Sequence, residues 1–455
     1  MYQTRRISLT DMFDYASACD YIERSACLGS RPGLERIRGL CEILGDPQED
    51  LSYIHIAGTN GKGSTGAMIA SALHACGLCV GMYYSPAVRG IKDHYMTDGQ
   101  IISDDDYASV VSEVAAANEK LTDRTGEGAT QFELETVVAF LYFKNKKCDA
   151  VVLETGMGGR DDATNIVTNK ICCVLTSISF DHMQYLGDTL YDIATVKAGI
   201  VTSDHPVIML GSEPEVTEAV RRRCNITGSA LSIVDPGRIT ITHDLPSGEI
   251  ISYDRFRDVH IPLTGGFQAE NAAVALTTVE VIKERRSLPK ANINDDDIRA
   301  GFAKVVWPFR FEKICDDPLI FVDGAHNADA AYRLCQTIKD RFADYTVILV
   351  MGMFRDKEYD KAVMILADTA YKIITVATPN NPRALPAQEL ANVAAKYCED
   401  TVAADSILKA YDIAIKSCAK AGEKSVVIAC GSFSYLAKFR SYVKEGKNGN
   451  RYGKG

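Results

Sequence analysis

The chain has 455 residues, which is too long for a single compact core, so we expect two or more domains. Its composition is that of an ordinary globular enzyme, with 46% hydrophobic and 24% charged residues. The formal net charge of −10 argues against a protein that binds nucleic acid or membrane surfaces broadly.

The beginning of the chain, MYQTRRISLTDMFDYASACD, has no long apolar stretch, so we expect no signal peptide. No run reaches about 18 apolar residues, and we expect no membrane-spanning helix. The 14 cysteines are scattered without the repeated paired spacing of a metal site. We interpret most of them as reduced, buried side chains of a cytoplasmic protein.

Short apolar runs alternate with amphipathic stretches along the chain. The first series of runs reads YIHIAG, CVGMYYS, DAVVLETG, KICCVLTSIS and PVIMLG. A second series starts near residue 318 and reads PLIFVDGAH, YTVILVMGM, YKIITVATP and KSVVIACGS. This alternation predicts an α/β fold in which helices cover largely parallel sheets.

The segment between the two series alternates apolar and polar residues. Its text, GRITITHDLPSGEIISYDRFRDVHIPL, predicts an antiparallel meander, and LTGGFQAENAAVALTTVEVIKE then predicts a helix. We place the domain boundary near Trp307-Pro308. The expected organisation is a catalytic domain over 1–306, a C-terminal domain over 307–445 and a flexible tail over 446–455.

A glycine-rich stretch, HIAGTNGKGST, lies between an apolar run and a helix-like run. It departs from the common phosphate-binding loop, because Gly63 follows Lys62 where that pattern has Ser or Thr. Gly58, Gly61 and Gly63 permit backbone turns that a side chain would block. Successive N–H groups could then surround a phosphate at the positive end of the following helix.

The side chains of this loop also suit a nucleotide. Lys62 could reach the outer phosphates, and Ser64 or Thr65 could ligate a metal ion or bind a phosphate oxygen. We expect the Lys62 charge to face solvent, with little role in core packing. The alternative is a glycine-rich turn without a ligand, but few such turns hold a lysine and two hydroxyls at a helix start. We therefore predict nucleotide binding.

Polar residues follow two later apolar runs. Glu154 ends a predicted strand, where a carboxylate could hold Mg²⁺, although it could equally be a surface or capping residue. Asp181 and His182 follow the next strand and suit a divalent ion at the same sheet edge, although a lone histidine is more often structural. Asp161 and Asp162 could cap a helix as easily as bind a substrate.

Taken together, these segments resemble the folylpolyglutamate synthase and dihydrofolate synthase family of the Mur ligase superfamily, over nearly the whole chain. Matching segments occur in family order: SRPGLERI, AGTNGKGS, TQFELET, GMGGRDDATN, GDTLYDIATVKAGI, FQAENAA, RFE, DGAHN and PRAL. Several motifs in one order are more specific than any single motif. The PGLER and TQFE segments favour the folate branch over the peptidoglycan ligases.

The resemblance implies a P-loop-containing Mur-ligase-type central domain with a mostly parallel sheet and a smaller Rossmann-like α/β C-terminal domain. It implies that ATP phosphorylates a carboxylate of a folate-type acceptor and that the amino group of L-glutamate attacks the acyl phosphate. The enzyme would extend tetrahydrofolate polyglutamate, make dihydrofolate from dihydropteroate, or do both. A related ligase with another acceptor and a nucleotide-binding regulatory protein without ligase activity are the alternatives.

The resemblance also implies site residues. Lys62, Lys197 and His182 would be catalytic, and Lys197 matches a lysine that carries a carbamate in this family. The nucleotide-binding positions would be Gly58, Thr59, Asn60, Gly61, Lys62, Gly63, Ser64, Thr65, Asn271, Arg310, Asp323 and His326. The Mg²⁺ ligands would be Ser85, Glu154 and His182. The positions near the acceptor would be Thr130, Phe132, Glu133, Asp161, Asp162 and Ala163.

Several positions depart from the family pattern. The family has SPHL followed by an E-R-I-like triplet, whereas this chain reads SPAVRGIKDHY, with Ala87 in place of the histidine. Phe267, Phe309 and Ala328 replace a histidine, a glycine and a proline in other motifs. The changed loop at 86–95 lies where the acceptor is expected, so the departures bear on the acceptor more than on the ligase reaction.

The resemblance implies small-molecule partners, namely ATP, L-glutamate and folate or dihydropteroate, and no nucleic acid or membrane. ATP, Mg²⁺ and a carbamylated Lys197 are the expected cofactors. We expect a cytoplasmic enzyme that is a monomer.

Overall fold

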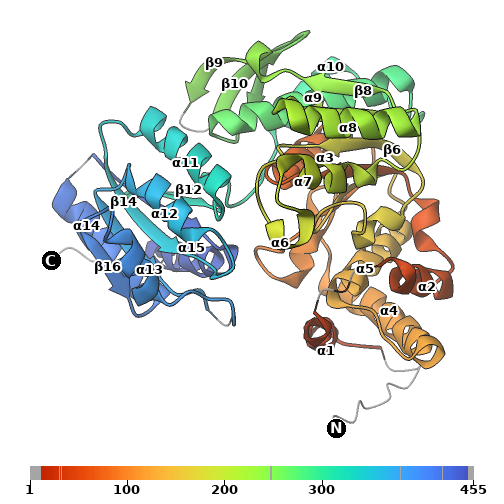
Figure 1. The fold of residues 1–455 in the computed structure, drawn as a ribbon, viewed down its shortest axis with the longest axis horizontal. Coiled ribbons are helices and arrows are strands. Elements are labelled where there is room, and N and C mark those ends of the chain that lie inside the picture. Colours follow the sequence, from red (N-terminus) through yellow and green to blue (C-terminus); the bar gives the residue numbers. More distant parts are fainter. Residues whose placement is uncertain are drawn as a thin grey trace. The chain divides into compact units, whose positions relative to one another are not determined.

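The computed structural model describes residues 12–29, 31, 33–245, 248–379, 381–422 and 424–448. These residues fall into two compact units, which Figure 1 colours from red to green and mainly in blue. The first unit comprises Met1–Thr240, Ser252–Val259 and Glu270–Val305 within the described residues, and the second comprises Ile241–Ile251, His260–Ala269 and Val306–Gly455. The chain enters the second unit for the last time at Val306, beside the expected boundary.

The first unit is built on an eight-stranded sheet with the order β4-β3-β2-β5-β1-β6-β7-β8. The strands are β1 (Tyr53–Ala57), β2 (Val80–Tyr83), β3 (Tyr95–Thr97), β4 (Gln100–Ile101), β5 (Ala150–Glu154), β6 (Lys170–Leu175), β7 (Val207–Leu210) and β8 (Leu231–Val234). From β2 to β8 in this order all neighbours are parallel, and β3 and β4 pair antiparallel at one edge. The predicted α/β fold is confirmed.

Strand β1 lies where the order of the strands in the first sheet reverses. From β1 the chain first builds β2 and β5 on one side and then β6, β7 and β8 on the other. Ligands in open parallel sheets bind outside the carboxyl ends of the strands, at the point where the order reverses. Strands β1 and β5 are buried along their whole length, which is why they read as continuous apolar runs.

Helices surround this sheet. They are α1 (Tyr15–Arg24), α2 (Glu35–Ile43), α3 (Lys62–Ala75), α4 (Asp104–Thr125), α5 (Gln131–Asn145), α6 (Met183–Leu186), α7 (Leu190–Lys197), α8 (Pro214–Thr227), α9 (Gly266–Arg285) and α10 (Asp295–Ala303). Single 3₁₀ turns are η1 (Ser25–Leu28), η2 (Pro47–Asp50), η3 (Ile91–His94), η4 (Ala163–Ile166), η5 (Ala198–Ile200) and η6 (Pro236–Arg238). No described helix is long and apolar enough to span a membrane.

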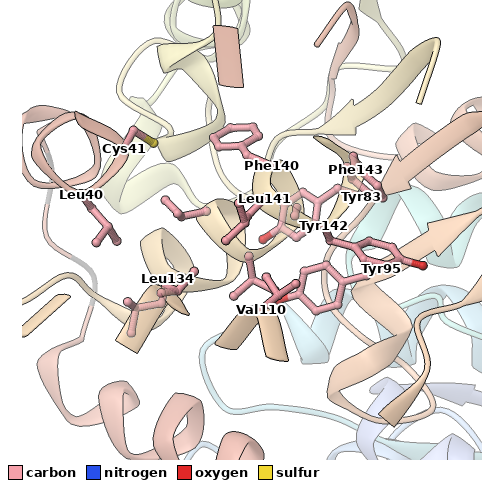
Figure 2. Packing of buried hydrophobic residues seen from close by; sticks show 14 of the residues in the cluster. Leu40, Cys41, Tyr83, Tyr95, Val110, Leu134, Phe140, Leu141, Tyr142 and Phe143 are labelled. Carbon is pink, nitrogen blue, oxygen red and sulfur yellow. The ribbon is translucent and has the colours of Figure 1, made fainter. Parts of the chain in front are cut away.

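Helices α4 and α5 begin at residues whose side chains cap them. The Ser103 side chain accepts a hydrogen bond from Asp106 N, and three aspartates in the first turn of α4 complement its dipole. Thr130 and Glu133 form a reciprocal capping box at the start of α5. One core cluster beneath these helices includes side chains of α2, α4 and α5 together with Tyr83 and Tyr95 of the sheet (Figure 2). The ring centroids of Tyr83 and Tyr95 lie 5.9 Å apart.

The second unit has a six-stranded sheet with the order β12-β13-β17-β14-β15-β16, in which only β12 pairs antiparallel. The strands are β12 (Glu312–Asp316), β13 (Leu319–Asp323), β14 (Thr346–Gly352), β15 (Lys372–Val376), β16 (Thr401–Ala404) and β17 (Ser425–Gly431). The helices are α11 (Ala328–Arg341), α12 (Tyr359–Ala367), α13 (Ala387–Ala394), α14 (Ile407–Ala421) and α15 (Phe433–Asn448). Helix α15 thus includes the start of the segment expected to be a flexible tail, and residues 449–455 lie outside the described residues.

The expected meander forms a separate sheet with the order β11-β10-β9. Its strands are β9 (Thr240–Leu245), β10 (Gly248–Tyr253) and β11 (Phe256–Ile261). Only two residues join β10 to β11, which antiparallel neighbours allow and parallel ones do not. All 14 cysteines are free and most are buried, in line with their interpretation as reduced core side chains.

Candidate active site

The glycine-rich loop joins β1 to α3 at the carboxyl edge of the first sheet, and it has no room for side chains at two positions. Gly61 has a φ of 86°, and a Cβ there would lie 2.2 Å from Asn271 Oδ1. Gly58 has a φ of 155°, and a Cβ there would lie 1.9 Å from Thr176 Oγ1. The loop therefore needs glycine for its conformation and for the close approach of its neighbours, and the backbone stays bare where a phosphate would sit.

Lys62 is the first residue of α3, and its side chain folds back over the loop. Its Nζ donates to the carbonyl oxygens of Gly58 at 3.3 Å and Thr59 at 3.2 Å. It also lies 3.8 Å from Glu154 Oε1. Because of these contacts only 15% of the side chain is exposed, so the expectation that the charge faces solvent is wrong. The amine is instead held at the edge where β1 and β5 end.

The residues after β6 fix the other side of the loop. Thr59 N donates to Ser177 O at 2.7 Å, and Thr59 Oγ1 donates to Ser179 O at 3.0 Å. Thr176 Oγ1 donates to Asn60 O at 2.8 Å. These bonds leave the loop with one well-defined path between two strands. The position of the predicted nucleotide loop is thus set by β6 as well as by β1.

Buried hydroxyls gather at the same edge. Among the described residues, the hydroxyls of Thr65, Thr155 and Ser177 are buried and have no hydrogen-bond partner. They follow β1, β5 and β6, whose carboxyl ends are adjacent in the sheet. A buried polar group without a partner is costly, and a ligand that bonds to it removes that cost. Thr155 and Ser177 are candidates that the sequence patterns did not single out.

Glu154 and Lys197 meet the loop from two further elements. Glu154 is the buried last residue of β5, and Lys197 is the buried last residue of α7. The Lys197 Nζ donates to Gly58 O at 2.7 Å, the same oxygen that Lys62 contacts. The two amines therefore cannot be farther apart than the sum of these two contact distances. Two like charges at such a separation repel each other in a partly buried site.

The other predicted metal positions lie on neighbouring elements. Ser85 follows β2, which pairs with β5 through Tyr83 and Leu153. His182 has a φ of 51° and a side chain that is 38% exposed, with its Nε2 3.8 Å from Asp181 Oδ2. Within the part of the chain that the structure describes, no three His, Cys, Asp or Glu side chains are grouped to hold a metal ion. A Mg²⁺ site here would depend on the Ser85 hydroxyl and on phosphate oxygens.

Two of the predicted acceptor residues hold each other. Glu133 Oε2 accepts hydrogen bonds from Thr130 N at 2.7 Å and Thr130 Oγ1 at 2.8 Å, and Arg36 Nε donates to it at 3.2 Å. The PGLER and TQFE segments are therefore in direct contact. Phe132 lies over the backbone after β5, because a Cβ on Gly156 would come within 2.5 Å of its ring.

The two neighbouring aspartates have different surroundings. Asp161 is exposed and pairs with Arg160 at 3.1 Å. Asp162 is buried, and its carboxylate accepts from Met157 N at 2.8 Å and from Thr164 N at 3.0 Å. Burial raises the pKa of Asp162, which these hydrogen bonds partly offset. Asp162 thus caps η4, in which Ala163 is also buried, and holds the preceding loop.

The changed loop after Ser85 is folded around a buried carboxylate. Asp93 Oδ1 accepts from Arg89 Nε at 2.9 Å and from Arg89 Nη2 at 2.6 Å, while its Oδ2 accepts from two backbone N–H groups. The hydrogen bonds to Arg89 lower the pKa of Asp93 against the opposing effect of burial. His94 Nδ1 lies 2.7 Å from Tyr84 O. The residues that replace the family triplet therefore hold both flanks of Ser85.

The predicted nucleotide residues of the second unit gather around Phe433. The Arg310 guanidinium lies 5.1 Å from the centroid of the Phe433 ring, and the His326 ring lies 6.3 Å from it. Asp323 ends β13 and accepts from Phe311 N and Ala325 N, both at 2.8 Å. Burial raises the pKa of Asp323. Asn271, by contrast, belongs to the first unit, beside Gly61.

The departure at Phe309 leaves the backbone shape of a glycine in place. Phe309 has a φ of 59°, a conformation that bulky residues rarely adopt, and its side chain is fully buried. Its ring packs against Phe433 with centroids 6.3 Å apart, and the Arg440 guanidinium lies 5.5 Å from its centroid. Aromatic packing therefore accompanies the strained backbone beside Arg310.

The chain matches two known domain families. Residues 56–279 match the Mur ligase middle domain, and residues 309–433 match the Mur ligase glutamate ligase domain. The chain is 32% identical to the dihydrofolate synthase/folylpolyglutamate synthase of Bacillus subtilis, over 94% of this chain and 99% of that protein. It is 34% identical to the folylpolyglutamate synthase of Lacticaseibacillus casei, over 82% and 87% of the two chains.

Solved structures give the same picture. The Mycobacterium tuberculosis folylpolyglutamate synthase complexed with ADP and AMPPCP matches with a TM-score of 0.85 and 29% identity, over 94% of this chain and 99% of that chain. Escherichia coli FolC in complex with DHPP and ADP matches with a TM-score of 0.83 and 28% identity, over 97% and 100%. Both similarities therefore extend over both units.

Proposed function

This chain belongs to the folylpolyglutamate synthase and dihydrofolate synthase family of Mur-type, ATP-dependent ligases, and on that premise we propose that it joins L-glutamate to a folate-type acceptor through an acyl phosphate. The observation that carries the proposal is the convergence of the glycine loop, Lys62, Glu154 and Lys197 on one sheet edge. A phosphate-binding backbone is there combined with the charges that phosphoryl transfer to a carboxylate requires.

In the proposed reaction an acceptor carboxylate oxygen attacks the γ-phosphorus of ATP, and ADP leaves. The amino nitrogen of L-glutamate then attacks the acyl carbon, phosphate leaves with the bonding electrons, and the nitrogen loses a proton to form the amide. The loop N–H groups and Lys62 hold the phosphates in line and stabilise the charge that spreads over the transferred group. The protein's part is mainly positioning and electrostatic stabilisation.

We propose that Mg²⁺ binds at the same edge. Ser85, Glu154 and His182 would hold it, with ATP oxygens and water completing the shell that Mg²⁺ prefers. The ion would neutralise phosphate charge when bound. A hydroxyl and a buried carboxylate at the ends of adjacent strands are oxygen donors of the right kind.

Glu154→Gln is expected to abolish activity or to raise the Mg²⁺ concentration for half-maximal activity about tenfold or more, because the amide lacks the charge that a hard cation needs. His182→Ala should act similarly. Mg²⁺ titrations of initial rates measure both effects, with Glu113→Gln, an exposed α4 residue, as the control. If both variants keep the parent's Mg²⁺ dependence, the cluster is structural.

The proposal also covers the remaining positions near the substrates. Arg310, Asp323 and His326 would contact ATP in the second unit, as Asn271 would in the first. Thr130, Phe132, Glu133 and the segment 161–163 would lie near the acceptor. The placement of the acceptor is supported by the capped start of α5 and by the Phe132 ring over Gly156.

Carbamylation of Lys197 belongs to the proposal as well. Its support is that Lys197 Nζ and Lys62 Nζ both contact the carbonyl oxygen of Gly58. Without the carbamate, two positively charged amines would lie close together. We further propose a monomer that works in the cytoplasm without nucleic acid or membrane partners. The net charge of −10 supports the lack of nucleic acid and membrane partners, and the 14 free thiols support the cytoplasm.

One experiment separates the proposal from its competitors. ADP release is measured with L-glutamate plus dihydropteroate, tetrahydrofolate, or no acceptor. Acceptor-dependent ADP release with either compound, together with the matching amide product, supports the folate ligase and shows whether one or both reactions occur. If ATP binds but neither dihydropteroate nor tetrahydrofolate leads to ADP release, the remaining explanations are a ligase for another acceptor and a regulatory protein. ATP binding is checked separately by calorimetry.

A further inference from the structure

A buried chain of hydrogen bonds leads from the middle of β1 to the loop after β5. His55 Nε2 lies 2.9 Å from Thr164 Oγ1, and Thr164 Oγ1 lies 2.6 Å from Asp162 Oδ1. His55 and Thr164 are fully buried, and Asp162 is nearly so. A histidine inside an otherwise apolar strand needs such a partner, because burying a polar group without one is costly.

The direction of these bonds follows from their chemistry. An ionised carboxylate only accepts, so Thr164 donates its one proton to Asp162 and must accept from His55 Nε2–H. The His55 Nδ1 then carries no proton, which agrees with its lack of a hydrogen-bond partner among the described residues. Burial holds the pKa of His55 well below its usual value, so the ring stays neutral.

Asp162 connects this chain of hydrogen bonds to the loop between β5 and η4. Its other oxygen accepts from Met157 N at 2.8 Å, only three residues after Glu154. The same stretch of backbone lies under the Phe132 ring at Gly156. The loop therefore begins next to Glu154, which lies 3.8 Å from Lys62 Nζ. It ends at Asp162, which is linked to His55 of β1 through Thr164.

We propose that His55, Thr164 and Asp162 form a positioning relay that fixes the loop 155–161 and so sets how tightly the acceptor is held. The inference rests on the proposed function, because an acceptor carboxylate must reach the outer phosphate beside Lys62 and Glu154. Under the proposed function the backbone that follows Glu154 would line that approach, because it continues from the carboxylate that lies 3.8 Å from Lys62 Nζ. His55 lies three residues before Gly58, so the same strand positions the nucleotide loop and anchors the acceptor loop.

Thr164→Val removes the relay hydroxyl with little change of shape and should raise the KM for the acceptor about tenfold, because a buried hydrogen bond that holds the loop is lost. The kcat and the KM for ATP should change less than about twofold. Thr164→Ser should restore the parent's values. His55→Leu should resemble Thr164→Val, whereas His55→Gln should recover part of the effect, because its amide can donate near the position of Nε2.

A matched control and a second measurement keep folding defects apart from positioning. Thr278→Val removes another fully buried hydroxyl, which donates to Val274 O at 2.8 Å in α9, and should leave the acceptor KM unchanged. Thermal unfolding is recorded for every variant. Hydrogen exchange is expected to be at least about tenfold faster at Met157 N in the two disrupting variants and unchanged in Thr164→Ser.

The outcomes separate this inference from the proposed function. If the parent enzyme turns over no folate-type acceptor, the proposed function fails, and the exchange rates still decide whether the relay fixes the loop. Unchanged exchange at Met157 in Thr164→Val would overturn the relay. So would acceptor and ATP KM values that rise together in proportion to lost thermal stability, since that pattern is the one expected of a merely structural residue.

Discussion

Lys62→Ala is expected to lower kcat/KM for the ligase reaction about 100-fold or more, a loss of roughly 3 kcal/mol of transition-state stabilisation. The Lys62 amine is held by the carbonyls of Gly58 and Thr59 at the start of α3. It is therefore preorganised where the phosphate chain must lie. A fixed charge of this kind costs no reorganisation when the transferred phosphoryl group develops its own charge, so its removal affects the chemical step most.

The fold should survive this substitution. The covered side chain makes two hydrogen bonds to loop carbonyls, whose loss costs about 1 kcal/mol each, and removing its charge leaves Glu154 without one neighbouring cation. Lys62→Met keeps the apolar stem and should be as inactive as the alanine variant. Lys144→Ala is the control, because Lys144 pairs with Asp50 on the surface, 2.7 Å away.

Rates are measured by ADP release at saturating L-glutamate, with circular dichroism to confirm folding. Near-normal turnover of either Lys62 variant would remove this residue from the mechanism. Equal losses in the Lys62 and Lys144 variants would point to a general effect of charge.

The closeness of the glycine loop and Glu154 could be predicted, because strand ends are readable in a sequence. Glu154 and the glycine loop each follow a continuous apolar run, and the carboxyl ends of parallel strands meet at one edge. The 3.8 Å contact between Lys62 and Glu154 is the structural counterpart of that reasoning. The parallel pairing of β1 with β5 and β6 likewise agrees with the predicted alternation of strands and helices, whereas the order of the strands was not predicted.

Contacts between distant segments could not be read in the same way. Lys197 looks like any lysine near the end of a helix, yet its amine reaches Gly58, 139 residues earlier. Only the family resemblance pointed to it. Arg36 and Glu133 are 97 residues apart and carry no shared periodicity, although their contact joins the two segments typical of the folate branch. His55 reads as one polar residue in a strand until its partner Thr164 is known.

Lys62 and Phe309 show a different limit. The pattern places Lys62 at a helix start but does not show that its stem folds back, because that depends on where Glu154 and the loop carbonyls lie. At Phe309 a rule that favours glycine at positive φ predicts the wrong residue. The ring of Phe309 is buried beside Phe433 and Arg440. Both neighbours are more than a hundred residues away in the sequence, so this packing could not be predicted from the local pattern.

Lys197→Ala is expected to be nearly inactive, with a loss of about 100-fold or more, and to be partly rescued by acetate. The reason is the proposed carbamate. The neutral amine attacks CO₂ and loses a proton, which gives an anion whose nitrogen keeps one hydrogen for the 2.7 Å bond to Gly58 O. A buried position beside the Lys62 amine disfavours a second positive charge. The two oxygens of a carbamate on Lys197 would instead place a negative charge next to the Lys62 amine.

Acetate can supply that carboxylate in the space left by the shortened side chain, whereas chloride at equal ionic strength cannot form the same paired contacts. The measurement is kcat/KM of Lys197→Ala against acetate concentration, with Lys170→Ala as a matched control. Lys170 is also buried on the first sheet, but it bonds to Asn165 Oδ1 at 2.8 Å and Ile200 O at 2.6 Å, at the opposite end of β6. Acetate should not raise activity in that control.

Added density on the Lys197 amine in a crystal of the active enzyme would support the carbamate. A bare, well-ordered amine there would contradict it, as would an active Lys197→Ala enzyme, because the carbamate would then have no part in the reaction.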